Sequence, residues 1–203
     1  MRNKPYHHGD LRAAIIEKGI EMINESGVHS LSLRKVARLC GVSEAAPYAH
    51  FANKEELLRA IEKHITCQFT AVLKESVKEI GETVAGYVSL GCAFAMFFAR
   101  NRQYYNLIYY HLSIKAGGED EYEPFDFIVK FMEKMFDNIN YPKETRQRAF
   151  IAHLAMIQGL TTLTVINTER DMNRLEESVR DLLSTNYLVY SKNNFLGEEN
   201  VCI

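Results

Sequence analysis

The amino-acid sequence predicts an all-α protein of about nine helices, and three observations favour this fold class. Apolar residues recur at spacings of three and four along most of the 203 residues, as they do on one face of an α-helix. No run of alternating apolar and polar residues bounded by turns suggests a β-hairpin. Only four prolines and 11 glycines are present, which leaves room for long uninterrupted helices.

The first two helices are expected near the N-terminus. Residues 11–23 place their apolar side chains on one helical face, and Gly27 follows where a helix commonly ends. Residues 33–40 carry a shorter apolar stripe, with Ser32 in the N-cap position and Gly41 as the stop. The sequence therefore predicts one long and one short amphipathic helix in this region.

Two more helices are expected in the next segment. A third, short helix follows Ser43, which occupies its N-cap position. Pro47 cannot donate the first intrahelical hydrogen bond of that helix, so we expect the helix to begin with an irregular or 3₁₀-like turn. A fourth helix opens at Asn53, with Glu56 three residues later to complete a capping box, and it continues without a breaker to about residue 80.

Five further helices follow, separated by glycine and proline signals. They are expected at about 82–100, 102–112, 124–139, 143–167 and 171–191. The segment 115–124 combines two glycines, an acidic cluster and a proline, which is typical of a loop.

Composition and motifs exclude several classes of protein. The longest strongly apolar run, residues 92–99, is far shorter than the ~20 residues of a membrane span, and the N-terminus lacks the apolar segment of a secretory signal. The four cysteines show no metal-ligand spacing, and the sequence contains no Gly-rich phosphate loop, nucleophile elbow or His-Glu-x-x-His motif. We therefore expect a cytoplasmic protein that is not an enzyme and that uses no metal, cofactor or membrane.

Charge is distributed unevenly along the chain. The whole sequence carries a net charge of −2, whereas residues 1–66 carry +2 and five of the seven histidines. The remainder carries −4, so the N-terminal third is the part of the chain whose charge favours binding of a polyanion. The asymmetry is mild, and it supports a nucleic-acid partner only together with a motif.

A helix-turn-helix motif is expected at about 32–51, where two short helices are separated by a tight turn that contains Gly41. In such a motif the second helix enters the major groove with its N-terminal end first. Ala45 and Ala46 at that end let the backbone approach base edges, and an alanine methyl packs well against the methyl group of thymine. From this pattern alone, an ordinary helical hairpin in a bundle is an equally good interpretation.

The residues around this motif resemble the TetR family. The stretch GVSEAAPYAHFANKEELL, residues 41–58, resembles the family's Gly-Val-Ser, Tyr-x-His-Phe and Lys-Glu-x-Leu-Leu core, and the preceding residues fit its first two helices. The resemblance covers about residues 7–66 and departs from the pattern at Pro47, where many members carry a larger aliphatic residue. Residues 93–111 and 153–163 resemble one branch of the family less specifically.

The resemblance implies a homodimeric, ligand-responsive transcriptional regulator, namely a repressor released from a palindromic double-stranded DNA operator by a small hydrophobic or aromatic effector. It implies a DNA-binding domain over residues 1–52 and a ligand-binding and dimerisation domain over residues 53–195. Effector binding would tilt the fourth helix and misplace the recognition helices. A helical small-molecule-binding protein whose helix-turn-helix no longer binds DNA is the alternative function.

Eight residues are expected to face DNA. They are Arg34, Ser43, Glu44, Ala45, Ala46, Tyr48, His50 and Lys54. Arg34 would contact a base or a phosphate, and the last three would reach phosphates. Glu44 would either accept from a cytosine amino group or favour the N-terminus of its own helix. Four residues ahead of the first helix form either a minor-groove arm or a disordered basic N-terminus: Arg2, Lys4, His7 and His8.

The C-terminal part is rich in large aromatic residues, which form either a bundle core or the wall of a ligand cavity. The candidate pocket residues are Phe94, Phe98, Tyr105, Tyr109, Phe127, Phe131 and His153. The dimer is expected to form through the helices at about 143–167 and 171–191, with Gly159 allowing close helix approach. Their expected contact residues are Phe150, Leu154, Ile157, Leu175, Val179, Leu182 and Leu183.

Overall fold

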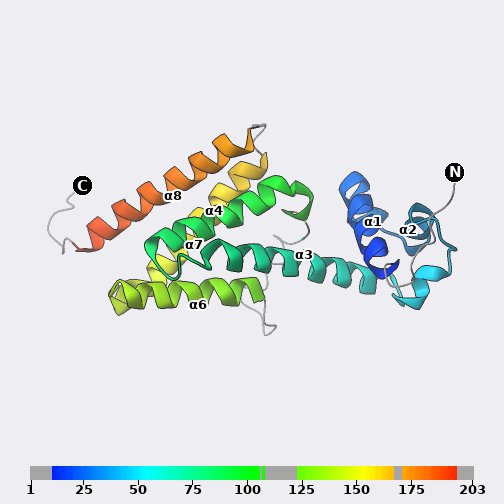
Figure 1. Cartoon of the computed structure of the whole chain (residues 1–203), viewed down its shortest axis with the longest axis horizontal. Coiled ribbons are helices and arrows are strands. Elements are labelled where there is room, and N and C mark those ends of the chain that lie inside the picture. Colours follow the sequence, from blue (N-terminus) through cyan, green and yellow to red (C-terminus); the bar gives the residue numbers. More distant parts are fainter. Residues whose placement is uncertain (1–10, 106, 108–122, 167–170, 196–203) are drawn as a thin grey trace. The chain divides into compact units, whose positions relative to one another are not determined.

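Figure 1 shows the computed structural model of the chain, which describes residues 11–105, 107, 123–166 and 171–195. The predicted all-α fold is confirmed, because these residues form helices and no strand. The α-helices are α1 (Leu11–Ser26), α2 (Leu33–Leu39), α3 (Lys54–Val77), α4 (Val84–Arg100), α6 (Glu123–Asn138), α7 (Arg146–Ile166) and α8 (Met172–Phe195). The short 3₁₀ helices among the described residues are η1 (Val28–Ser30), η2 (Ala46–Ala49) and η3 (Lys143–Thr145).

Two expected segments lie partly or wholly outside the described residues. Of the helix expected at 102–112, residues 102–105 and 107 are helical, and the others are not described. Most of the expected loop at 115–124 is not described either, and its last two residues, Glu123 and Pro124, already belong to α6. Proline is compatible with the first turn of a helix, since its nitrogen needs no hydrogen-bond partner there.

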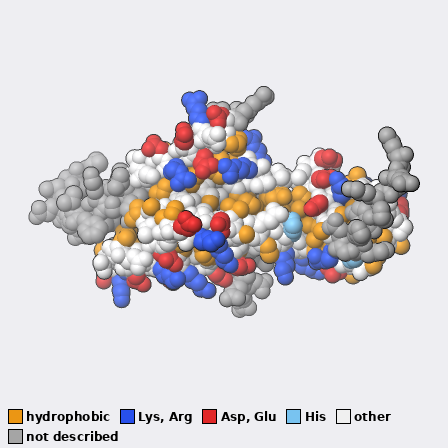
Figure 2. All heavy atoms as spheres, in the orientation of Figure 1, with side chains coloured by type: hydrophobic (Ala, Val, Ile, Leu, Met, Phe, Trp, Pro, Cys, Tyr) orange, Lys and Arg blue, Asp and Glu red, His pale blue; other side chains and the backbone are white. Residues whose placement is uncertain are grey.

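The chain divides into two compact units, residues 1–68 and 69–203, and the boundary falls inside α3. α1, α2 and residues 54–68 of α3 belong to the first unit, and residues 69–77 of α3 belong with the remaining helices. On the face drawn in Figure 2, acidic and basic side chains are interspersed, in keeping with the net charge of −2.

The first unit is built around the apolar faces of its helices. Its large buried side chains include Ile15, Phe51, Leu57 and Ile61, each 1% exposed or less. Gly19 lets α1 approach α3 closely, because a Cβ at this position would lie 2.8 Å from Cδ1 of Ile61. The absence of a side chain at Gly19 therefore permits the close contact with Ile61 at this point of the unit.

The predicted cap by Asn53 at the start of α3 is confirmed, whereas Glu56 bonds one residue earlier than a capping box requires. Oδ1 of Asn53 accepts a hydrogen bond from the backbone N–H of Glu56 at 2.9 Å. In return, Oε2 of Glu56 accepts from the backbone N–H of Ala52 at 2.6 Å. These two bonds satisfy backbone donors that have no partner within the helix, and they fix where α3 begins.

The expected third α-helix is replaced by the 3₁₀ turn η2. Pro47 is buried and has no N–H, so it cannot donate the first α-helical bond of the segment. Its carbonyl instead accepts from the backbone N–H groups of His50 and Phe51, each at 3.0 Å. The irregular turn expected at the start of this helix therefore extends over the whole segment.

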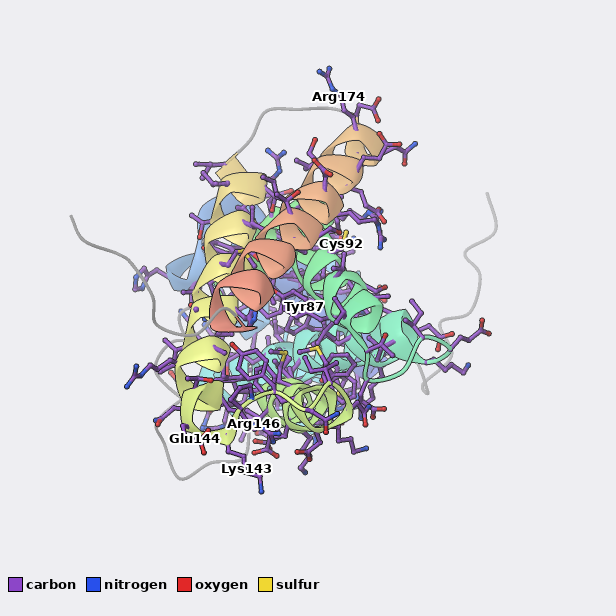
Figure 3. The ribbon with its side chains drawn as sticks, turned by 90° about the vertical axis from the view of Figure 1, so that its left-hand side faces the viewer. Tyr87, Cys92, Lys143, Glu144, Arg146 and Arg174 are labelled. Carbon is purple, nitrogen blue, oxygen red and sulfur yellow. The ribbon has the colours of Figure 1, made fainter. Side chains whose placement is uncertain are left out.

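α4 lies at the centre of the second unit, with α6, α7 and α8 packed against it (Figures 1 and 3). Most of its side chains are buried, and Phe94 and Phe98 are 2% exposed or less. The second half of α3 adds Phe69 and Leu73, both 0% exposed. The core of this unit is therefore an aromatic-rich contact between one central helix and its neighbours.

α7 is more apolar than the sequence analysis recognised. Residues 143–166 are long and apolar enough to cross a membrane by length and composition alone, with a mean hydropathy of 1.7 over their best 18 residues. The core helix of a soluble protein passes the same test. One face of α7 does carry buried polar groups that bond to α4, since Thr164 donates to the carbonyl of Ala95 at 3.5 Å. The opposite face exposes large apolar side chains: Ile151, Leu163 and Ile166.

Candidate nucleic-acid interface and effector site

A tight turn joins α2 to the segment that precedes η2. Gly41 adopts a φ of +68°, a value that favours glycine, and the backbone N–H of Val42 donates to the carbonyl of Ala37 at 3.0 Å. The chain then presents Ser43 and Ala45 on the surface, both exposed. The turn at Gly41 is therefore followed by a segment in which the short side chains of Ser43 and Ala45 are exposed.

Glu44 forms ion pairs that neither sequence interpretation anticipated. Its carboxylate lies 2.6 Å from Nη2 of Arg38 and 3.9 Å from Nε of Arg34. The hydrogen bond from Arg38 is the main cause that lowers the pKa of Glu44, and the charges of both arginines act in the same direction. Glu44 is therefore held by the two arginines of α2.

The three expected phosphate ligands lie on or near the surface of the same unit. Tyr48 is 49% exposed, and the half-buried His50 has its ring centre 6.5 Å from that of Phe51. Nζ of Lys54 donates to the backbone carbonyl of His29 at 3.2 Å. Ala46, the last of the eight candidates, is half-buried beside the buried Pro47. The eight residues thus all belong to one unit.

Sequence reasoning missed Arg38. Its position four residues after Arg34 puts both side chains on the same face of α2, which was a usable signal. Its contact with Glu44 depends on the turn at Gly41, and the helical pattern does not specify the path of that turn. Arg12 was also missed; its guanidinium lies 5.2 Å from the ring centre of Phe51.

Three of the candidate pocket residues meet in one aromatic cluster. The rings of Phe94 and Phe98 lie 4.9 and 5.1 Å from the ring of Phe69 on α3. The ring of Tyr105 lies 5.8 Å from Phe98, and its hydroxyl shares a hydrogen bond of 2.7 Å with Thr162 of α7. This cluster therefore joins α3 to α4 through ring contacts, and Tyr105 links it to α7.

His153 lies in the interior beside Tyr87, a residue of α4 that is labelled in Figure 3. It is 3% exposed, and its Nδ1 lies 3.0 Å from the Tyr87 hydroxyl. Burial lowers the pKa of His153 to about 4, because the charged imidazolium is poorly solvated there. At neutral pH this histidine is an uncharged hydrogen-bonding group within the helical core.

The remaining pocket candidates are less closely associated with that cluster. Phe131 is 3% exposed and lies near Gly86, where an added Cβ would come 3.1 Å from its ring. The partly exposed Phe127 lines a hollow of about 490 Å³ together with Lys74 and Lys130. Tyr109 lies outside the described residues. Within the described part of the chain, no group of three His, Cys, Asp or Glu residues could hold a metal ion.

Comparison with known proteins relates residues 15–61 to bacterial regulators. Residues 15–61 match the family model described as "Bacterial regulatory proteins, tetR family". The fatty acid metabolism regulator protein of Bacillus subtilis (strain 168) is 35% identical over 65 residues, which are 32% of this chain and 34% of the relative. The chain thus matches about a third of the length of this relative.

Solved structures share the fold over most of the chain. A Rhodococcus sp. RHA1 protein of unknown function has a TM-score of 0.69 at 24% identity, covering 91% of this chain and 98% of the other. AibR, in complex with isovaleryl coenzyme A and operator DNA, has a TM-score of 0.60 at 18% identity, covering 84% and 96%. At these identities the likeness concerns the fold.

Proposed function

The chain belongs to the TetR family of bacterial regulatory proteins through the domain that residues 15–61 form, and we propose that it is a ligand-responsive, DNA-binding repressor. The observation that carries the proposal is the exposed segment Ser43–Ala45, which follows α2 through a glycine turn and in which the short side chains of Ser43 and Ala45 flank Glu44. Such a segment can enter the major groove, with phosphate ligands such as Tyr48 and Lys54 following it. We place the protein in the cytoplasm, and assign it no enzymatic role.

The proposed effector is an acyl thioester of coenzyme A. Support comes from AibR, whose fold is similar and whose structure contains isovaleryl coenzyme A, and from the fatty-acid regulator of Bacillus subtilis. The packed aromatic cluster of Phe69, Phe94 and Phe98 supplies apolar side chains of the kind that an acyl chain would contact. The seven candidate pocket residues remain our proposal for its lining.

α3 is the proposed link between effector and DNA. The helix begins at Lys54 in the first unit and contributes Phe69 to the aromatic cluster of the second, with no break in its hydrogen-bonded run. A ligand inserted against Phe69 would move α3 and change the spacing of the recognition segments. The ligand shifts the equilibrium between the two spacings only by the difference in its affinity for them. Such a coupling is typically about 1–3 kcal/mol, which changes operator affinity about 5–150-fold.

The proposed homodimer uses the exposed faces of α7 and α8. On α7, Ile151, Ala155, Gly159 and Leu163 recur every four residues and are all exposed. Nothing lies within 4 Å of a Cβ built at Gly159, so a partner helix could approach closely there. Two recognition segments related by a two-fold axis would read a palindromic operator with half-sites about 34–36 Å apart.

Several expected dimer residues need correction. Ile157, Leu175, Val179 and Leu183 are buried within the chain itself, at 7% exposure or less. They pack inside the helical unit and are not available to a partner. Leu182, in contrast, is 46% exposed on α8.

One experiment distinguishes the repressor from the alternative function, which is a ligand-binding protein that has lost DNA binding. The full chain is incubated with a pool of random duplexes, and bound duplexes are selected over several rounds. Enrichment of a palindromic site supports the repressor. Recovery of an unenriched pool, from protein that still binds isovaleryl coenzyme A, supports the alternative.

A further inference from the structure

Arg38 and Glu44 form an ion pair on the exposed surface of the helix-turn-helix. One carboxylate oxygen of Glu44, Oε1, accepts hydrogen bonds from Nε of Arg38 at 3.0 Å and from its Nη2 at 2.6 Å. The side chains of Arg38 and Glu44 are 72% and 46% exposed, so the pair is open to a partner.

The contact with Glu44 uses only one edge of the guanidinium, the edge formed by Nε and Nη2. The edge formed by Nη1 and Nη2 makes no further hydrogen bond with the described residues. An arginine carries five N–H donors in a rigid fork, so a carboxylate can hold one edge while the other binds a second pair of acceptors. Glu44 therefore orients Arg38 without occupying all of its donors.

Folding stability does not account for this pair. An exposed ion pair contributes little to folding, because water and salt screen it and two long side chains lose freedom. Glu44 is also flanked in sequence by the short side chains of Ser43 and Ala45, at the surface proposed to enter the groove. Arg38 is consequently a long, oriented donor group next to a surface of short side chains.

We propose that Arg38 reads a guanine in each operator half-site and that Glu44 is its positioning residue; this inference rests on the proposed DNA-binding function. Guanine presents O6 and N7 in the major groove as a pair of acceptors, and the arginine fork matches them bidentately. The negative charge of Glu44 also opposes loose phosphate contacts by Arg38, which favours sites that contain the guanine over random DNA.

The test compares base preference and not affinity alone. Full-chain wild type and the Arg38→Lys variant each select bound duplexes from a random library, and base frequencies are compared at every half-site position. Lysine keeps the charge but loses the fork, so guanine preference at one position should fall about 5- to 150-fold, as for a lost bidentate contact, while other positions keep theirs. Glu44→Gln should weaken the same preference and raise the affinity for random duplexes.

Lys35→Gln is the matched control, because it removes an exposed charge from α2 without altering the pair. It should lower affinity for all duplexes alike and leave the base frequencies unchanged. Identical base frequencies for wild type and Arg38→Lys would overturn the reading of guanine by Arg38. An unchanged preference in Glu44→Gln would overturn the positioning role. If wild type itself enriches no sequence, the proposed function fails, and that failure is distinct from the other two.

Discussion

A hydrogen bond of 3.0 Å joins Nδ1 of His153 on α7 to the hydroxyl of Tyr87 on α4. The two rings meet nearly edge to face, with centres 4.8 Å apart. Both residues are almost fully buried, so this polar contact between α4 and α7 lies away from water. Burial there disfavours the charged imidazolium and keeps the ring neutral.

The buried histidine should make folding stability depend on pH. Its pKa is lowered to about 4 in the folded chain, against 6.5 as the reference value, so the unfolded chain binds the proton more readily. Stability from this group is complete above pH 6.5 and is lost as the pH falls toward 4. Between pH 7 and pH 5 the loss should be about 2 kcal/mol in the free energy of unfolding.

Urea unfolding of wild type and His153→Gln at both pH values measures this loss. Glutamine keeps a hydrogen-bonding group near Tyr87 but does not titrate, so the difference between pH 7 and pH 5 should shrink by that amount in the variant. Other titrating groups act equally in both proteins and cancel. An identical pH dependence in the two proteins would mean that His153 takes up a proton as readily when folded as when unfolded.

Lys54 should contribute a sequence-independent phosphate contact. Lys54→Ala is expected to weaken binding to all duplexes by a similar factor and to reduce the slope of log affinity against log salt by about one. Fluorescence anisotropy at several salt concentrations gives both quantities. Lys63→Ala, an exposed lysine further along α3, serves as the control and should leave the slope unchanged. A Lys54→Ala slope equal to that of wild type would contradict the contact.

Charge on the exposed face of α7 should separate the proposed dimer. Ile151 and Leu163 are 58% and 60% exposed, so replacing both by glutamate disturbs little of the chain's own packing. Sedimentation should then give a monomer where wild type gives a dimer at micromolar concentration, with helical content preserved. The control is Ile80, a 43% exposed residue that follows α3. The Ile80→Glu variant also gains a surface charge, and it should remain dimeric. A dimer that persists in the double variant would place the interface elsewhere.

Effector and operator should weaken each other's binding by the same factor. Isovaleryl coenzyme A is the probe, and we expect it to lower affinity for the selected operator about 5–150-fold. Because the coupling is reciprocal, saturating operator DNA should lower affinity for the thioester by an equal factor. Free coenzyme A is the control for the acyl chain. Tight binding of the thioester with unchanged operator affinity would show that its site is not the regulatory switch.

Much of the helical arrangement could be predicted because local residues specify it. Asn53 and Glu56 begin α3 through bonds within a few residues of each other, and Gly27 follows the end of α1 with a positive φ. Pro47 likewise predicts an irregular recognition segment, because it has no backbone N–H to donate. In each case the physical cause is backbone hydrogen bonding within one turn, and the residue types that make or prevent these bonds can be read from the sequence.

The candidate site was less predictable, since it depends on contacts between elements. The pairing of Arg38 with Glu44 requires the path of the turn at Gly41, and helical periodicity contains no information about that path. The face of α7 that remains exposed was also misjudged, because Ile157 and Ile151 are equally apolar and only packing on α4 separates them. Tyr87 and His153 lie 66 residues apart in sequence, so their contact also depends on how the helices pack.

The central claim is that the segment around Ala45 enters the DNA groove, and one affinity measurement tests it most directly. Ala45 is exposed, so Ala45→Glu should fold as wild type does, while its carboxylate is repelled by the DNA. On the duplex selected by wild type, anisotropy should give tight binding for wild type and no sequence-specific binding for Ala45→Glu, with equal thermal stability. Equal affinity of the two proteins for that duplex would contradict the account.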